Sequence, residues 1–368
     1  MFCDSIPQTP LVIIKEMENS TSSNAQFLDS EFRYTLFPVF YGIVFVLGLG
    51  ANSYALYVLR YLRDARAMNE VRIYMTNLTV ADLLFVAALP FWISYYARGG
   101  DWIFGDPLCR ITGSLFFINT YCSVLFLCVI SINRYWAVTR PLQAAKSDHW
   151  RRGVCVSVAV WAGTLLATIP YLAAPGVQMD GNKSRCLEGY QNENTNKRAG
   201  VAATHFVIIG LFFVVFLVVM VCNVLIARVL LTQPLIKERS IVQNTSGGNS
   251  SKVRPSGTKR RALRMLCAVV TIFAVCFLPH HIVQGPWTLV VLGMADNWSQ
   301  STKQRLNDAH QVTIMLMGLN CMLDPVVYCF ATSKFRQYVK GHFNMFKKGR
   351  ACNTQTTTMT HISMANKN

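Results

Sequence analysis

Long stretches with almost no charged side chain recur along the chain and are separated by shorter polar segments. At 1.5 Å per residue, each stretch is long enough to cross the roughly 30 Å hydrocarbon core of a bilayer as an α-helix. Seven spans are predicted, at residues 37–59, 73–97, 111–133, 153–179, 200–227, 265–295 and 309–332. The pattern therefore predicts an all-α membrane protein, a seven-transmembrane helix bundle.

The third span organises the rest of the prediction. Residues 111–133 are 23 consecutive positions without a formal charge. The span begins near Cys109 and ends in Asn133-Arg134-Tyr135, where a charge meets the water boundary. We expect the first end to be a covalent anchor and the second end to be a switch.

Composition supports a membrane protein. The chain is 52% hydrophobic and only 14% charged, with a mean hydropathy of +0.31. A soluble helical bundle is the alternative, but its helices would alternate polar and apolar faces, which these stretches do not. The chain is predicted to have four segments, with polar ends on either side of the apolar part: an N-terminal tail at 1–33, a transmembrane domain at 34–332, an amphipathic helix at 333–346 and a C-terminal tail at 347–368.

The net charge of +17 would suit a nucleic-acid partner if it were spread over the chain. Instead, 25 of the 35 Lys and Arg residues fall on the side that holds the C-terminus, together with only 4 of the 18 Asp and Glu residues. Basic loops mark the cytoplasmic side. We therefore expect a plasma-membrane protein with an extracellular N-terminus, anionic membrane lipid as a partner and no nucleic acid. No signal peptide is predicted, because residues 1–15 have no basic region before their short apolar run, and the first span can act as the insertion signal.

Modification sites follow from this topology. Glycosylation is expected at three sequons on the extracellular side, Asn19, Asn182 and Asn297. Cys352 in the C-terminal tail is a candidate for palmitoylation, and the Thr and Ser residues beyond it are candidates for phosphorylation. Of the 12 cysteines, only Cys3, Cys109 and Cys186 face the oxidising side. The helix-anchored pair is preferred, so a Cys109–Cys186 disulfide is predicted.

Two carboxylates lie within predicted spans, where charge is costly. Asp82 and Asp324 are each the only acid in their span. If they approach each other, the site must take up a proton or hold a cation. Oxygen ligands favour a hard cation, here Na⁺, as an allosteric ion rather than a cofactor. The supporting side chains would be Asn52, Asn119, Ser123 and Asn320. Two separately hydrogen-bonded carboxyls are the alternative.

Prolines interrupt helical hydrogen bonding in several spans. Pro90, Pro170, Pro279 and Pro325 should each kink or loosen a helix, either as a static bend or as a hinge. Pro279 follows Phe273 and Phe277, and Pro325 stands between Asp324 and Tyr328. These two prolines are the most suggestive hinges.

A second polar group is expected near the extracellular ends of the spans. It comprises His205, His280, His281, Gln284, His310 and Gln311, interleaved with Trp92, Tyr95, Phe116, Phe117 and Trp287. We see no acidic residue among them. N–H groups would suit a phosphate or ester oxygen, and aromatic faces would hold a quaternary ammonium. No transition-metal site is expected, because no carboxylate or cysteine has suitable spacing beside the histidines.

These residues together resemble the rhodopsin-like G-protein-coupled receptors. The resemblance rests on seven spans with Asn52, Asp82, Cys109, Asn133-Arg134-Tyr135, Trp161, Cys186, Phe277-Leu278-Pro279 and Asp324-Pro325-Val326-Val327-Tyr328. Asn133, Asp324 and Phe277 depart from the usual residues, and Asp324 is typical of the purine-receptor-like branch. Asn133 removes a local carboxylate that would hold Arg134, so Asn133→Asp is expected to lower basal signalling.

Within that family, closer resemblance implies a ligand and partners. Residues 29–38 resemble the outer end of the first helix of a receptor for an ether phospholipid with a phosphocholine head, and its pocket-bearing stretches are resembled by residues 116–123, 279–281, 286–289 and 307–313. This implies Gq and Gi proteins as partners, with arrestin and receptor kinases at the tail. The phosphate and glycerol region is expected at His205, His280, His281, Gln284 and Gln311, and the choline or alkyl parts at Trp92, Tyr95, Trp102, Phe116, Phe117 and Trp287.

The G-protein surface is expected at the cytoplasmic ends, with Arg134, Lys259, Arg260 and Arg261. Its switch residues would be Asn133, Tyr135, Phe277, Pro279, Pro325 and Tyr328. Another lipid or a nucleotide remains an alternative ligand. A transporter is the non-receptor alternative, although no inverted repeat is evident. An enzyme is not expected, because no nucleophile, base or metal constellation shares one face.

Overall fold

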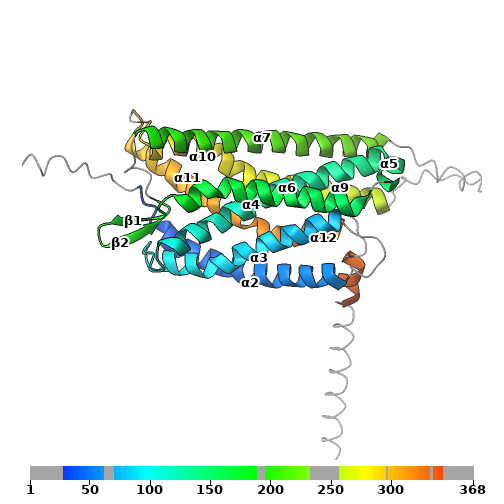
Figure 1. Ribbon diagram of the computed structural model, residues 1–368, viewed down its shortest axis with the longest axis horizontal. Helices are drawn as coiled ribbons and strands as arrows, with labels where there is room; N and C mark the ends of the chain where they lie inside the picture. Colours follow the sequence, from blue (N-terminus) through cyan, green and yellow to red (C-terminus); the bar gives the residue numbers. More distant parts are fainter. Residues whose placement is uncertain are drawn as a thin grey trace, which may run out of the picture.

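The computed structural model describes residues 28–61, 70–146, 148–188, 195–232, 257–295, 297–331 and 335–342. Long helices lie side by side in a bundle, with a short β-hairpin projecting at one end (Figure 1). We call the end with the Cys109–Cys186 bond the disulfide end. The opposite end, where Asn133-Arg134-Tyr135 lies, is called the NRY end.

Six helices are long and apolar enough to cross a membrane within the described part of the chain. They comprise α2 (Phe32–Tyr61), α3 (Glu70–Ala97), α4 (Asp106–Thr139), α6 (His149–Ala173), α7 (Thr195–Thr232) and the continuous run α9 (Gly257–Ile272), η2 (Phe273–Phe277) and α10 (Leu278–Val291). The predicted seventh span at 309–332 corresponds to α11 (Gln300–Gly318) and α12 (Asn320–Ala331), which are separated at Leu319. Short α5 (Pro141–Lys146) joins α4 to α6.

Helix α4 occupies the middle of the bundle. It packs against α3, α6 and α7, and 61% of its most apolar window is buried, compared with 22% for α2. By contrast, α7 exposes large aliphatic side chains such as Leu211, Val214 and Leu217, each more than 60% exposed. Such a surface is unfavourable in water but suits hydrocarbon. The segregation agrees with a bundle whose outer face is turned to lipid.

The fourth predicted span was wrong at its C-terminal end. Helix α6 ends at Ala173 rather than continuing to Met179, since Pro175-Gly176 follows and proline cannot extend a helix. Residues Val177–Asp180 instead form β1, which pairs antiparallel with β2 (Lys183–Cys186). The hairpin carries Cys186, and the predicted bond to Cys109 at the start of α4 is confirmed, with a Cα–Cα distance of 5.8 Å.

Pro279 coincides with an irregular helix, as predicted. The residues before it, Phe273–Phe277, form a π-helical turn between α9 and α10. Proline has no N–H to donate to the preceding turn, so the local hydrogen-bond register changes there. Pro90, Pro170 and Pro325 lie inside helices that continue past them.

The predicted amphipathic helix is partly described. Residues 335–342 are helical and lie at the NRY end of the bundle (Figure 1). Phe335 is 2% exposed and packs into the core with Tyr338 and Val339, whereas Lys340 is exposed. The remaining positions of the predicted segment, 333, 334 and 343–346, lie outside the described residues. Asn19, Cys352 and the C-terminal phosphorylation candidates lie outside them.

Candidate functional site

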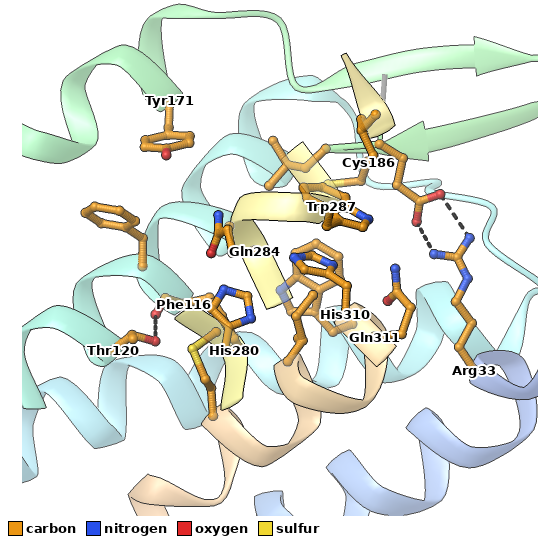
Figure 2. A pocket seen from close by; sticks show the side chains of 18 of the residues that line it. Arg33, Phe116, Thr120, Tyr171, Cys186, His280, Gln284, Trp287, His310 and Gln311 are labelled. Carbon is orange, nitrogen blue, oxygen red and sulfur yellow. Dashed lines mark hydrogen bonds and ion pairs between the residues drawn. The ribbon is translucent and has the colours of Figure 1, made fainter. Parts of the chain in front are cut away.

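A cavity of about 260 Å³ lies between the helices at the disulfide end (Figure 2). Eight of the residues predicted to bind ligand line it: Trp92, Phe116, Phe117, His205, His280, Gln284, Trp287 and Gln311. His310 lines it as well. The wall is mainly aromatic and aliphatic with a few polar groups, which is typical of small-molecule sites.

Two threonines determine the tautomers of two cavity histidines. Thr288 donates its hydroxyl proton to the Gln284 carbonyl (2.7 Å), so it must accept from His205 Nδ1 at 2.9 Å. Thr313 likewise donates to the His310 carbonyl and accepts from His280 Nδ1 at 3.3 Å. In a neutral imidazole, the other nitrogen is then an acceptor. These rings therefore do not offer a free N–H donor unless they are protonated, contrary to the expectation that their N–H groups face a phosphate.

His310 is held by stacking. Its ring lies 3.7 Å from that of Trp287 at an interplanar angle of 3°, and His280 is 5.1 Å away. Trp287 donates through Nε1 to Asn307 at 3.0 Å. The contact joins α10 to α11, and it fixes one aromatic face of the cavity (Figure 2).

Three of the predicted ligand residues do not line the cavity. His281 stacks on Phe212 at 3.6 Å and donates through Nδ1 to the Phe277 carbonyl at 2.8 Å. Trp102 donates to the Gly105 carbonyl and packs behind Trp92, with ring centroids 5.6 Å apart. Tyr95 donates to Glu188 at 2.8 Å. Each supports the wall from behind.

The charged part of the cavity wall was not predicted from the sequence. Arg33 and Glu188 both line the cavity, and within the described ranges no other formally charged side chain does so. Their contact is bidentate, with Nη1–Oε1 at 2.7 Å and Nη2–Oε2 at 2.9 Å. The expectation that no acidic residue belongs to this group was therefore wrong. The position of Glu188, two residues after Cys186, was a usable signal.

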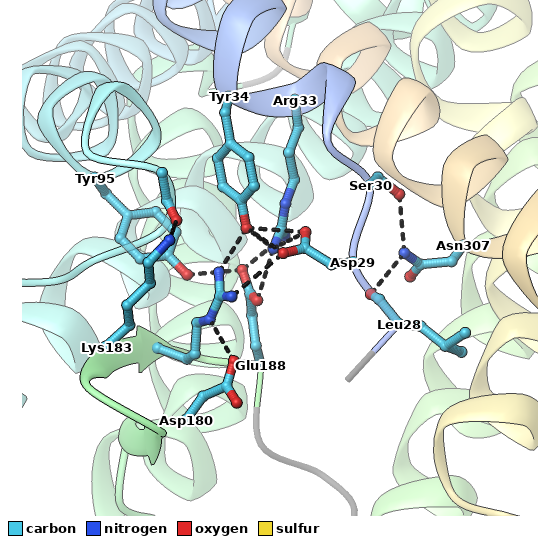
Figure 3. A network of polar contacts seen from close by, with 12 residues as sticks. Leu28, Asp29, Ser30, Arg33, Tyr34, Tyr95, Asp180, Lys183, Glu188 and Asn307 are labelled. Atoms are coloured by element: carbon cyan, nitrogen blue, oxygen red, sulfur yellow. Dashed lines mark hydrogen bonds and ion pairs between the residues drawn. The ribbon is translucent and has the colours of Figure 1, made fainter. Parts of the chain in front are cut away.

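A polar network fixes this pair (Figure 3). Asp29 contacts Arg33 Nη2 at 2.9 Å and Arg185 Nη2 at 3.2 Å, and Tyr34 donates to it at 2.7 Å. Burial by itself raises the pKa of Asp29, but the charge of Arg33 and the hydrogen bond from Tyr34 outweigh it, so the pKa is lowered. Burial also opposes the charge of Arg185, yet its bond to Tyr34 and the nearby carboxylates raise its pKa. The network ties the start of α2 to the hairpin.

The hairpin approaches α4 closely beside the cavity. Leu187 has a positive φ of 59°, which turns the chain between Cys186 and Glu188. Its side chain lies where a Cβ on Gly113 of α4 would stand, only 2.1 Å from that position. A side chain at position 113 would therefore force the Leu187 side chain to shift. The turn brings the disulfide and Glu188 to the same side of the bundle.

A separate polar cluster lies in the middle of the bundle. Asn119 donates to Asp82 Oδ1 at 2.8 Å, and Asn320 donates to Ser123 at 2.9 Å. All four side chains are at most 2% exposed, as is Asp324, which is close enough to Asp82 for their charges to repel. Asn52 donates instead to the Gly48 and Cys321 carbonyls. Within the described ranges, no group of three His, Cys, Asp or Glu side chains is placed to hold a metal.

Most of the chain matches a known protein family. Residues 51–328 match the family described as 7 transmembrane receptor (rhodopsin family), which is more than half of the chain. The chain belongs to the rhodopsin family of seven-transmembrane receptors. This confirms the predicted seven-span, multi-pass membrane fold, and it places the receptor in a signalling family rather than an enzyme family.

Relatives of this receptor match it over nearly their whole length. The platelet-activating factor receptor of Homo sapiens is 43% identical over 353 residues, 94% of this chain and 96% of that protein. The receptor of the same name from Mus musculus is 43% identical over 337 residues, 90% and 92% of the two chains. G-protein coupled receptor 183 of Bos taurus is 30% identical over 332 residues, 88% of each.

At the NRY end, the receptor has a carboxylate that the sequence did not reveal. Glu70 at the start of α3 is 1% exposed and accepts a hydrogen bond from Asn133 Nδ2. His149 Nδ1 lies 2.9 Å from the same carboxylate, and Arg152 Nη1 lies 3.5 Å from it. Asn133 therefore contacts an acid on a neighbouring helix.

The other predicted switch residues are distributed along the receptor. Phe277 is fully buried against Phe273, with ring centroids 5.5 Å apart, directly before Pro279. Arg134 and Tyr135 are partly buried at the end of α4. The side chains of Lys259, Arg260 and Arg261, in the first turns of α9, and of Tyr328 in α12 are outside the described residues. Asn182 and Asn297 are exposed.

Proposed function

We propose that this protein is a cell-surface receptor for an ether phospholipid with a phosphocholine head, platelet-activating factor, which it couples to Gq and Gi proteins. The cavity is the observation that supports this ligand, because its aromatic wall and polar residues suit an amphiphile. The chain is also 43% identical to the platelet-activating factor receptor of Homo sapiens.

The binding assignment follows the chemistry of the wall. Trp92, Phe116, Phe117 and Trp287 hold the choline or alkyl parts, since aromatic faces attract quaternary ammonium and pack against methylenes. The amides of Gln284 and Gln311 donate to phosphate or ester oxygens, with His205 and His280 beside them. Tyr95, Trp102 and His281 act by supporting these side chains.

Activation is a population shift. Agonist binds more tightly to a state in which α9 and α10 have moved outward about the π-turn before Pro279, and G protein binds the same state from the NRY end. The two affinities are therefore coupled reciprocally. Arg134 and the basic run at 259–261 contact the G protein, and Pro325 with Tyr328 adjusts α12. Arrestin and receptor kinases act at the C-terminal tail.

The proposal extends to the membrane topology, the covalent modifications and a sodium site. The N-terminus is extracellular in the plasma membrane, which agrees with an oxidised Cys109–Cys186 pair at that end. Asn19, Asn182 and Asn297 carry glycans, and Cys352 is palmitoylated. Sodium binds allosterically between Asp82 and Asp324 with Asn119, Ser123 and Asn320, because two buried carboxylates that repel one another favour a cation.

A calcium-release assay tests the ligand. Cells expressing the receptor should respond to the ether phosphocholine lipid and should respond far less to its deacetylated form. Untransfected cells of the same line are the control. No calcium response, or equal responses to both lipids, would contradict the proposed ligand.

A further inference from the structure

The Arg33–Glu188 pair has an unusual combination of properties for a structural ion pair. The Arg33 side chain is 3% exposed, yet both residues line the ligand cavity, which is otherwise uncharged among the described residues. Buried ion pairs give little net stability, because desolvation cancels much of the attraction. The position of the Arg33–Glu188 pair on the cavity wall instead indicates a role in binding the ligand.

One N–H donor of the Arg33 guanidinium has no hydrogen-bond partner among the described residues. Its Nη1 and Nη2 atoms contact Glu188, Asp29 and Tyr34, but Nε is buried and has no hydrogen-bond partner among the described residues. A buried guanidinium N–H normally has an acceptor, and a phosphate oxygen is a strong one. The neutral tautomers of His205 and His280 make them poor competitors for that oxygen.

Glu188 is held in position by its other neighbours. Tyr95 donates to Oε1 at 2.8 Å, and the turn at Leu187 follows the disulfide of Cys186. The Glu188 carboxylate is therefore held at the cavity wall. A fixed carboxylate on a wall that also contains Trp92 and Trp287 is the chemistry that recognises a quaternary ammonium.

We infer that Arg33 and Glu188 form the headgroup subsite of the cavity, with a zwitterionic phosphocholine lying antiparallel to the pair: phosphate at Arg33 and ammonium at Glu188. The inference rests on the proposed function and names the residues that select a zwitterion. Ligand and protein dipoles then neutralise each other, whereas a lipid that carries phosphate alone leaves Glu188 facing an anion. The glycerol and ester oxygens remain for the glutamine amides deeper in the cavity.

The test uses two ligands. One is the ether phosphocholine lipid, and the other is its isostere in which the quaternary nitrogen is replaced by carbon, so that the headgroup keeps its size but loses its positive charge. On the unaltered receptor, the isostere should bind at least about tenfold more weakly, equivalent to about 1.4 kcal/mol. Equal affinities would overturn the inference without any variant being made.

Glu188→Gln should remove this preference. It should weaken the zwitterionic lipid about tenfold and leave the isostere unchanged or bound more tightly, because a neighbouring anion has been removed. Adding Arg33→Gln to Glu188→Gln should weaken both ligands by the same factor, since both keep the phosphate. If Glu188→Gln weakened the binding of the zwitterionic lipid and of the isostere by the same factor, the inference would be overturned.

Controls separate folding from recognition. Asp180→Asn removes a carboxylate of the same hairpin that contacts Arg185 at 3.1 Å and does not line the cavity, so both affinities should stay unchanged. Glu188→Asp, measured at matched surface expression, should retain a preference for the zwitterion. If the ether phosphocholine lipid fails to bind the unaltered receptor, the proposed function itself is wrong. If the lipid binds but Glu188→Gln weakens both ligands by the same factor, only the headgroup subsite is wrong.

Discussion

Asn133→Asp is the substitution whose expected effect the structure changes most. The sequence suggested that an aspartate there would restore a lock on Arg134 and lower basal signalling. In the structure, Asn133 donates to the buried carboxylate of Glu70, which also faces His149 and Arg152. Aspartate has no donor when ionised, so the substitution replaces a hydrogen bond by two facing carboxylates.

The magnitude follows from that contact. A hydrogen bond to a charged group contributes about 1.5–3 kcal/mol, and repulsion between the carboxylates adds to the loss. If this contact belongs to the resting state, a change of about 2 kcal/mol moves the resting-to-active equilibrium roughly 30-fold. Basal signalling of Asn133→Asp should therefore rise, as measured by inositol phosphate accumulation without agonist at equal surface expression.

A charge exchange provides the control. Glu70→Gln combined with Asn133→Asp again leaves one amide facing one carboxylate, so the double variant should return toward the basal signalling of the unaltered receptor. Lower basal signalling in Asn133→Asp alone would refute the role given to Glu70. A double variant no closer to the unaltered receptor than the single one would refute the pairing.

Three further outcomes are expected. Asp82→Asn should abolish the effect of sodium on agonist affinity, compared with potassium at equal ionic strength; an unchanged sodium effect would exclude this ion site. His280→Ala should lower agonist affinity with little change in melting temperature, whereas His281→Ala should lower the melting temperature through loss of its Phe212 contact; the reverse pattern would contradict their placement. Cys186→Ala should reduce thermal stability and surface expression, since closing a loop of 77 residues contributes about 4 kcal/mol; normal levels of both would contradict the anchoring role of the bond.

Much of the fold was predictable because hydrophobic length is a strong signal. The spans, the central position of the 111–133 stretch and the Cys109–Cys186 bond all follow from where uncharged runs begin and end. The end of α6 was not predictable from hydrophobicity, since residues 174–179 remain uncharged although Pro175 ends the helix. Composition shows what can lie in a membrane, but backbone geometry determines where a helix ends.

The site was only partly predictable because a residue's neighbours come from distant segments. Arg33 and Glu188 are 155 positions apart, and each looked like an ordinary charge outside the membrane. His280 and His281 are adjacent and chemically identical, yet one lines the cavity and the other stacks on Phe212. Helical rotation separates them, and the sequence alone does not give that rotation.

The π-turn at Phe273–Phe277 bears on this rotation. A π-turn accommodates one extra residue, and each residue of an α-helix turns the chain by about 100°. If the turn relaxed to a regular α-helix while α9 stayed fixed, α10 would rotate by about that amount, and His280 would take the direction that His281 has now, away from the cavity. The receptor therefore has, in five residues, a means of withdrawing His280 from the cavity by rotating α10 about its own axis.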